Sequence, residues 1–140
     1  MKLIRISIVL VLGINFLLII SACGGKSGDA TLAESRDPVE RGRTLYESST
    51  IGPNKAPGCK TCHSLEADRK IVGPSMAGIA IMAQSNPLGS SAEEFLRQSI
   101  VNPDEYVLEG FPAGVMYKRY EQDLSPQQVE DLVAFLMSLK

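Results

Sequence analysis

Histidine and cysteine are scarce in this sequence, which has one histidine and three cysteines among 140 residues. A structural zinc site needs four nitrogen or sulfur ligands around the metal. Cys59 and Cys62 lie beside the lone His63, but Cys23 is far away near the N-terminus. The chain therefore has too few ligands in one place for such a site.

A strand pattern is also missing, because no stretch shows the apolar–polar alternation of a half-buried strand. A thioredoxin-like dithiol requires a strand before its Cys-x-x-Cys sequence and a βαβ chain around it. Residues 52–58 precede the cysteine pair with a proline- and glycine-rich run instead. The sequence thus favours an all-α domain and disfavours a redox dithiol, although the dithiol stays open as the minor alternative.

No apolar run reaches the length that a membrane-spanning helix needs, which is about 20 residues. Residues 6–20 are almost wholly apolar and follow a short basic start with Lys2 and Arg5. This arrangement is typical of a signal peptide. Residues 20–23, Ile-Ser-Ala-Cys, resemble the bacterial lipobox, in which the cysteine is acylated and becomes the first residue of the mature chain.

We therefore expect a lipoprotein signal peptide over residues 1–22, a lipidated Cys23 with a flexible tether over residues 23–36, and a folded domain over residues 37–140. An uncleaved signal anchor remains the alternative, because Leu3 and Ile4 extend the apolar run to about the lower limit for spanning. Either way the domain is expected outside the cell membrane, on its periplasmic or extracellular face. Cleavage would remove Lys2 and Arg5 and change the formal net charge from −2 to −4. Nucleic-acid binding is not expected, since it calls for a basic patch.

Residues 59–63 read Cys-Lys-Thr-Cys-His, the attachment signature of c-type haem. Each thiol can add across one vinyl group of the porphyrin, and the histidine then brings an imidazole nitrogen to the iron. His63 is the only histidine of the chain and stands at the one position where this signature requires it.

Helix signals follow the expected domain in order. Asp37 before Pro38, Ser91 before two glutamates, and Ser125 before Pro126 each predict a helix start. The helices are expected over about 38–48, 79–84, 92–101 and 126–139, giving three or four in all. Residues 104–122 show no clear period, and a loop of this length in a small domain is usually functional.

Residues 37–140 resemble a class I cytochrome c. The resemblance rests on Cys59, Cys62, His63, the Gly-Pro pair ending at Pro74, and a methionine, Met116, in a glycine-rich loop. It implies a small all-α fold around one covalently bound haem c. It also implies that the terminal helices cross through Gly42, Tyr46, Leu132 and Phe135, and that the Pro74 carbonyl accepts a hydrogen bond from the axial imidazole.

The resemblance places Met116 as the sixth ligand of the iron. Met76 and Met82 lie only 13 and 19 residues past His63 and are expected to pack, whereas Met116 lies 53 residues past it and can reach the other face. Met137, on the last helix, is expected in the core. The family usually has proline directly after the ligand methionine, and this chain has Tyr117 there.

An iron saturated by imidazole and thioether suits an electron carrier, because no position is left for a substrate. The domain is therefore not expected to be an enzyme. The alternative is a ligand sensor or peroxidase-like protein with a dissociable Met116. Redox proteins or the subunits of a membrane electron-transfer complex are the expected partners. The stretch 103–116 and the lipobox together are similar to monohaem subunits of quinol-oxidising complexes such as alternative complex III. A basic rim is also expected, at Lys55, Lys60, Lys118 and Arg119.

Overall fold

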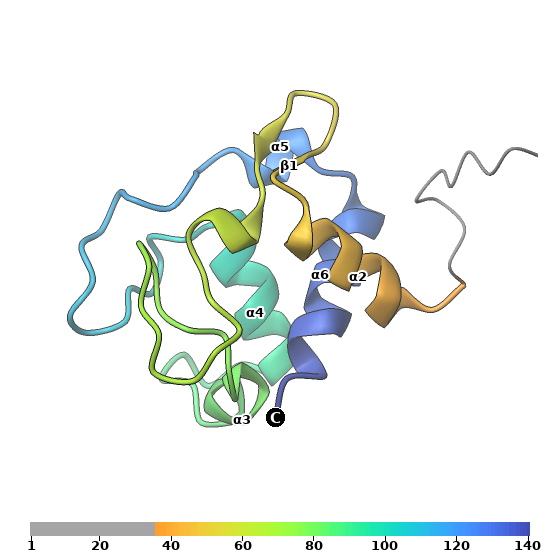
Figure 1. Cartoon of the computed structure of the whole chain (residues 1–140). Coiled ribbons are helices and arrows are strands. Elements are labelled where there is room, and N and C mark those ends of the chain that lie inside the picture. The colour runs from red at the N-terminus through yellow and green to blue at the C-terminus, as the bar shows by residue number, and fades with distance from the viewer. Residues whose placement is uncertain (1–35) are drawn as a thin grey trace, which may run out of the picture. The chain divides into compact units, whose positions relative to one another are not determined.

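The first and last helices of the folded part cross each other, and the other elements gather around this crossing (Figure 1). The computed structural model describes residues 36–140, so the expected signal peptide, Cys23 and nearly all of the tether lie outside the described residues. The described elements are α2 (Pro38–Glu47), β1 (Thr50–Ile51), β2 (Ala56–Pro57), the 3₁₀ turn η1 (Cys59–Thr61), α3 (Ile79–Gln84), α4 (Ala92–Val101), α5 (Tyr120–Asp123) and α6 (Pro126–Met137).

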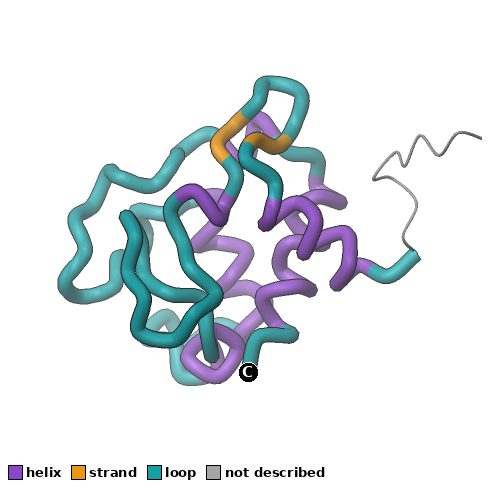
Figure 2. Tube along the Cα trace, viewed as in Figure 1, coloured by secondary structure: helices purple, strands orange, loops and turns teal. Residues whose placement is uncertain are grey.

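The expected all-α fold is confirmed, with helices and long loops making up nearly all of the described chain (Figure 2). Residues 36–140 hold five α-helices, one more than the expected maximum. The additional helix is α5, which has only four residues, too few to show a helical period in the sequence. The antiparallel pair β1–β2 was also not expected, because strands of two residues cannot show an alternation.

The three expected N-caps are present, at Asp37, Ser91 and Ser125. Ser125 forms a reciprocal capping box with Gln128. Ser91 accepts from the backbone of Glu94 at 3.2 Å, but the Glu94 carboxylate does not return the bond. It binds Arg97 and Gln98 instead. The expected box at Ser91 is therefore only half formed, because a nearby guanidinium attracts the carboxylate more strongly than a backbone amide does.

The crossing of α2 and α6 depends on the missing side chain of Gly42. A Cβ atom there would lie 1.8 Å from the carbonyl oxygen of Asp131 and 2.7 Å from the Cβ of Phe135. Next to this contact the rings of Tyr46 and Phe135 pack with centroids 5.3 Å apart. Arg41 adds a two-pronged ion pair to the buried Asp131. The expected packing of the terminal helices is thus confirmed.

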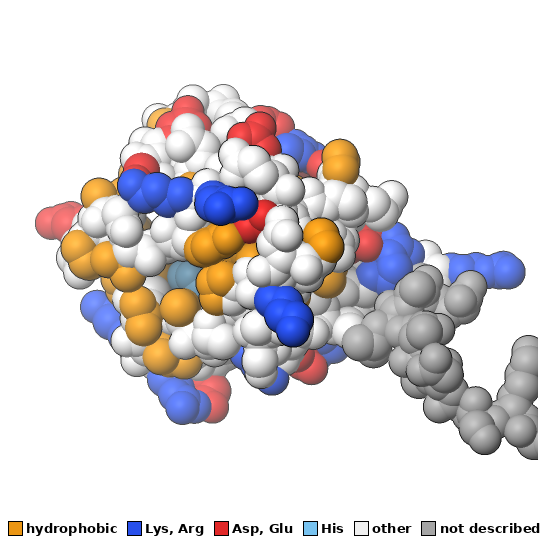
Figure 3. All heavy atoms as spheres, turned by 90° about the horizontal axis from the view of Figure 1, so that it is seen from above, with side chains coloured by type: hydrophobic (Ala, Val, Ile, Leu, Met, Phe, Trp, Pro, Cys, Tyr) orange, Lys and Arg blue, Asp and Glu red, His pale blue; other side chains and the backbone are white. Residues whose placement is uncertain are grey.

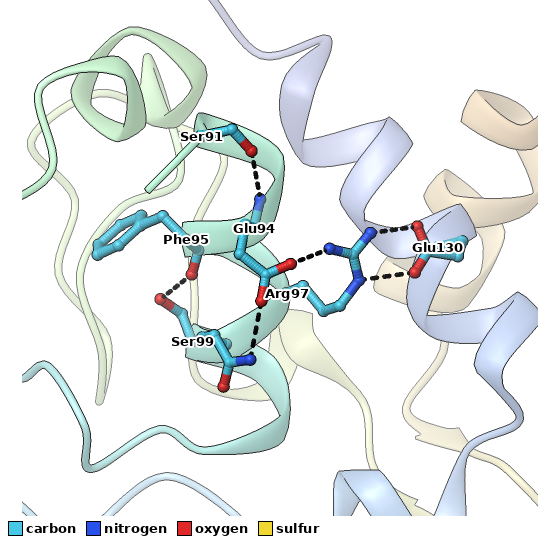
Figure 4. A network of polar contacts seen from close by, with 7 residues as sticks. Ser91, Glu94, Phe95, Arg97, Ser99 and Glu130 are labelled. Atoms are coloured by element: carbon cyan, nitrogen blue, oxygen red, sulfur yellow. Dashed lines mark hydrogen bonds and ion pairs between the residues drawn. The ribbon is translucent and has the colours of Figure 1, made fainter. Parts of the chain in front are cut away.

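Arg97 ties α4 to α6 on the other side of the last helix (Figure 4). Its guanidinium donates to both oxygens of Glu130 at 2.7 Å and to Glu94 at 2.5 Å. One planar cation therefore joins two helices in a fixed orientation, in the bidentate geometry that guanidinium favours.

Two long loops complete the described part of the chain. The loop over 62–78 and the loop over 102–119 both lie to the left of α4 in Figure 1. The C-terminal end is tied down by the amide of Ala80, which donates to the Leu139 carbonyl at 3.1 Å. Within residues 36–140, no helix combines the length and apolar character that crossing a membrane requires.

Candidate functional site

A cavity of about 340 Å³ lies among the two long loops, α4 and the terminal helices. This volume is at the lower end of the range of roughly 300–1,000 Å³ that small-molecule and cofactor sites occupy. Its walls are mostly aliphatic and aromatic, and the helical side of the lining includes Tyr46, Phe95, Leu96, Leu132 and Leu136. Such a cavity suits a flat apolar group with a few polar attachment points.

The two cysteines enter this cavity from one tight turn. Directly after η1, the amides of Cys62 and His63 both donate to the carbonyl of Cys59, at 3.1 and 2.9 Å. In a 3₁₀ turn residues three apart lie on the same side, so the two thiols face one way. Both are free and both line the cavity. Burial raises the pKa of the Cys59 thiol to about 11.

His63 is oriented by Pro74. Its Nδ1 lies 2.9 Å from the Pro74 carbonyl oxygen. A carbonyl can only accept, so Nδ1 carries the proton, and in a neutral ring Nε2 then keeps a free lone pair. Burial lowers the pKa of the His63 imidazole, which favours this neutral form. The ring is thus prepared as a nitrogen ligand, with the orienting bond that metal-bound histidines usually make.

Gly73 and Tyr46 fix His63 from two further directions. A Cβ atom at Gly73 would lie 2.4 Å from Cε1 of the imidazole, so the ring packs directly on bare backbone. The Tyr46 hydroxyl donates to the His63 carbonyl at 2.9 Å. Sequence reasoning expected Tyr46 only as a helix contact and missed this bond. The available signal was general: a buried tyrosine hydroxyl needs a hydrogen-bond partner.

Three methionines line the cavity, namely Met76, Met82 and Met116. The backbone of Met76 is bonded to the Ser64 carbonyl at 2.8 Å, so Met76 is attached to the residue next to His63. Met82 belongs to α3 and is 37 % exposed. Met116 is half-buried in the separate loop 102–119 and packs against the core. The cavity therefore brings together all five expected site residues, and the choice of Met116 as the iron ligand stays a prediction.

This donor set fits the expected cofactor. Two thiols on one face of a turn provide the attachment points, the imidazole offers a free nitrogen, and the methionines offer thioether sulfur. Iron in a porphyrin takes both ligand types. The expected lipidation site, Cys23, lies outside the described residues.

Comparison with known proteins agrees with this description. Residues 39–140 match the family model described as Cytochrome c. Searches of curated proteins and of solved structures returned no match to the chain.

Proposed function

The chain belongs to the cytochrome c family, and on this basis we propose that it is a monohaem electron carrier whose iron is bound by His63 and Met116. Family membership makes it an electron-transfer protein with covalently bound haem c, which supplies an iron that gains and loses one electron. The finer assignment is carried by the 2.9 Å bond from His63 Nδ1 to the Pro74 carbonyl, which leaves Nε2 free on a cavity that Met116 also lines.

In this proposal the protein side chains hold the cofactor and its ligands in fixed positions and take no part in a chemical reaction. Cys59 and Cys62 attach the cofactor, Pro74 and Tyr46 orient His63, and the apolar walls keep water away. A neutral imidazole and a neutral thioether need no proton when the iron changes charge. With His63 and Met116 both bound to the iron, such a site would transfer electrons with little rearrangement and would offer no place for a substrate.

Replacing the sixth ligand tests this assignment. Met116→Ala should convert a low-spin iron to a high-spin one, lower the reduction potential, and allow the reduced protein to bind carbon monoxide. Met76→Leu and Met82→Leu are the matched controls and should stay low-spin. Loss of the low-spin spectrum in a control instead of in Met116→Ala would refute the ligand assignment. Ready binding of carbon monoxide by the unaltered protein would favour the sensor or peroxidase-like alternative.

We further propose that the domain is tethered to the membrane through lipid on Cys23. The support is the lipobox after a signal-peptide-like apolar run. Cys23→Ser should block processing at that site, and mass spectrometry of the detergent-extracted protein should find a diacylglyceryl group on Cys23 as the first residue. An unmodified chain starting at Met1 would show an uncleaved anchor. Co-purification from native membranes tests the proposed membership of a quinol-oxidising complex such as alternative complex III.

The proposed docking surface is the apolar rim of the cavity, defined here as Val72, Phe111, Pro112 and Val115. Val72 and Val115 are 50 % and 52 % exposed. Figure 3 shows hydrophobic side chains around the pale-blue histidine, with Lys and Arg further out. Electrons pass between proteins most readily where little protein separates the cofactors, so this opening is the natural place for contact with a redox partner.

The expected basic rim is weaker than the sequence suggested. Lys118 is paired with Asp104, and Arg119 lies 3.5 Å from a carboxylate oxygen of Asp123. Lys55 and Lys60 are exposed and take part in no salt bridge within the described residues. Their role in docking to an acidic partner stays a prediction.

A further inference from the structure

The residue after Met116 is Tyr117 and not the proline that the family usually has there, yet the loop is fastened at two points. The Asp104 carboxylate accepts from the backbone of Gly114 at 2.8 Å and also pairs with Lys118. This clamp brings the two sides of the loop together on the exposed surface. It does not by itself connect the loop to the rest of the cavity wall.

The second fastening is a buried carboxylate, Asp123, whose side chain is 0 % exposed. It accepts from the Tyr117 hydroxyl at 2.5 Å and from Asn54 Nδ2 at 2.7 Å. These two bonds, in that order, hold the pKa of Asp123 below its usual range, and Arg119 adds to the effect. A buried charge is costly unless donors surround it, so the three partners and the carboxylate stabilise one another.

Asn54 places the other end of this network close to the haem attachment turn. It lies in the turn between β1 and β2, and β2 leads through Gly58 into Cys59. The tip of this hairpin rests on α5, since a Cβ atom at Gly52 would lie 2.2 Å from the Asp123 carbonyl oxygen. The Tyr120 hydroxyl donates to the Pro57 carbonyl at 2.6 Å and adds a second link.

We propose that Asp123 is a positioning residue for the Met116 thioether. It acts through Tyr117, which follows Met116 directly, and through Asn54, which precedes the cysteines. The Asp123 carboxylate thereby joins the segment before Cys59, where the haem is attached, to the segment after Met116. In this chain a buried hydrogen-bond network does what a proline would do by restricting φ. The inference rests on the proposed function, since it requires Met116 to be the axial ligand.

The test is the rate at which imidazole enters the ferric holoprotein. An external ligand has to wait until Met116 leaves the iron, so at saturating imidazole the rate reports how often it leaves. Asp123→Asn removes the negative charge and replaces one of the two carboxylate oxygens by an NH₂ group. That group is a donor and would face a donor, either the Tyr117 hydroxyl or the Asn54 amide. Asp123→Asn and Tyr117→Phe should each raise this limiting rate about tenfold or more, as expected for the loss of a hydrogen bond to a buried charged group. Tyr117→Phe decides the question alone if Asp123→Asn does not fold.

Glu130→Gln is the matched control, because it weakens the Arg97 ion pair between α4 and α6 and touches no residue of the Met116 loop. It should lower the unfolding temperature without changing the imidazole rate. A rate in Asp123→Asn and Tyr117→Phe no higher than in Glu130→Gln would overturn the proposal and leave Asp123 a purely structural residue. Met116→Ala distinguishes a failure of the Asp123 proposal from a failure of the ligand assignment on which it rests. If that variant keeps the low-spin spectrum, Met116 is not the ligand, and the proposed function fails first.

Discussion

At the scale of single residues, the site depends on groups that are not themselves ligands. His63 is fixed by a carbonyl, a hydroxyl and a glycine, which restrict its ring, its backbone and the space beside it. Within the described residues, every buried side-chain nitrogen or oxygen has a hydrogen-bond partner. The ligand is therefore oriented before the iron is bound, and little energy is spent on ordering it.

Gly73→Ala should disturb this arrangement. The added methyl group would lie 2.4 Å from the imidazole, so the ring must turn or the backbone must move. We expect a loss of stability of about 1–3 kcal/mol and a fraction of high-spin iron, measured by thermal unfolding and by the visible spectrum.

Gly89→Ala is the control for this change. Its backbone has a φ of +71° and an added Cβ meets nothing within 4 Å, so that variant is destabilised by backbone strain of its own and makes no contact with the ring. It should lose stability but stay fully low-spin. An unchanged spectrum in Gly73→Ala would mean that the ring is not positioned by this contact.

At the scale of helices, local chemistry made most of the fold predictable. The starts of α2, α4 and α6 follow from Asp37, Ser91 and Ser125, because an N-cap side chain acts within three residues. The hairpin β1–β2 and α5 were missed because they are too short to show a period and because the contacts between them join distant parts of the chain. Asn54 and Asp123 are 69 positions apart, and a contact between residues so far apart leaves no mark on the local sequence.

The same limit applies to the site. The haem attachment residues were found because their spacing is short and specific. The roles of Tyr46 and Asp123 depend on tertiary neighbours and could not be found in this way. That Gly42 meets α6 was accessible only through the family resemblance, since the helix propensity of a glycine indicates a close approach but not which helix makes it.

Gly42→Ala should destabilise the protein even though alanine favours helix formation over glycine by about 1 kcal/mol. The added Cβ would lie 1.8 Å from a backbone oxygen of α6, so the two helices must separate. Gly42→Val should cost more stability than Gly42→Ala. Phe135→Ala, as a separate variant, should cost about 3–5 kcal/mol because the ring is fully buried. Each of the three variants should lower the urea midpoint of unfolding.

A valine on the exposed side of the same helix, Glu47→Val, controls for a β-branched residue away from the crossing, and the exposed ion pair to Arg43 that it removes is worth little. It should cost less than about 1 kcal/mol. If Gly42→Ala proves more stable than the unaltered protein, the helices do not need the glycine at their crossing.

At the scale of the whole molecule, the proposed electron carrier has to meet its partner through one face. We expect Val115→Asp in the apolar rim to slow reoxidation of the reduced domain by native membranes at least tenfold, measured with a soluble form that lacks residues 1–23. A carboxylate at that position has to be desolvated when the proteins meet, and desolvation of a charge is costly.

Ile81→Asp is the matched control, because Ile81 is 58 % exposed and does not line the cavity. Equal rates in the two variants would place docking elsewhere.

The effect of charge on docking is tested by reversing the charges of Lys55 and Lys60. Reversal should weaken any decrease of the electron-transfer rate with rising salt concentration. Lys118 and Arg119 are unsuitable, since both bind carboxylates that fasten the Met116 loop.

The crossing of α2 and α6 also sets the order in which the molecule can be completed. It joins residues 90 positions apart, as the bond from Arg41 to Asp131 shows, so closing it carries the entropy cost of a long loop. Leu132 and Leu136 of α6 form part of the cavity wall. This wall stays open until α6 has packed against α2. The thiols of Cys59 and Cys62 are therefore accessible for haem attachment as long as the terminal helices are apart, and the pocket closes when they meet.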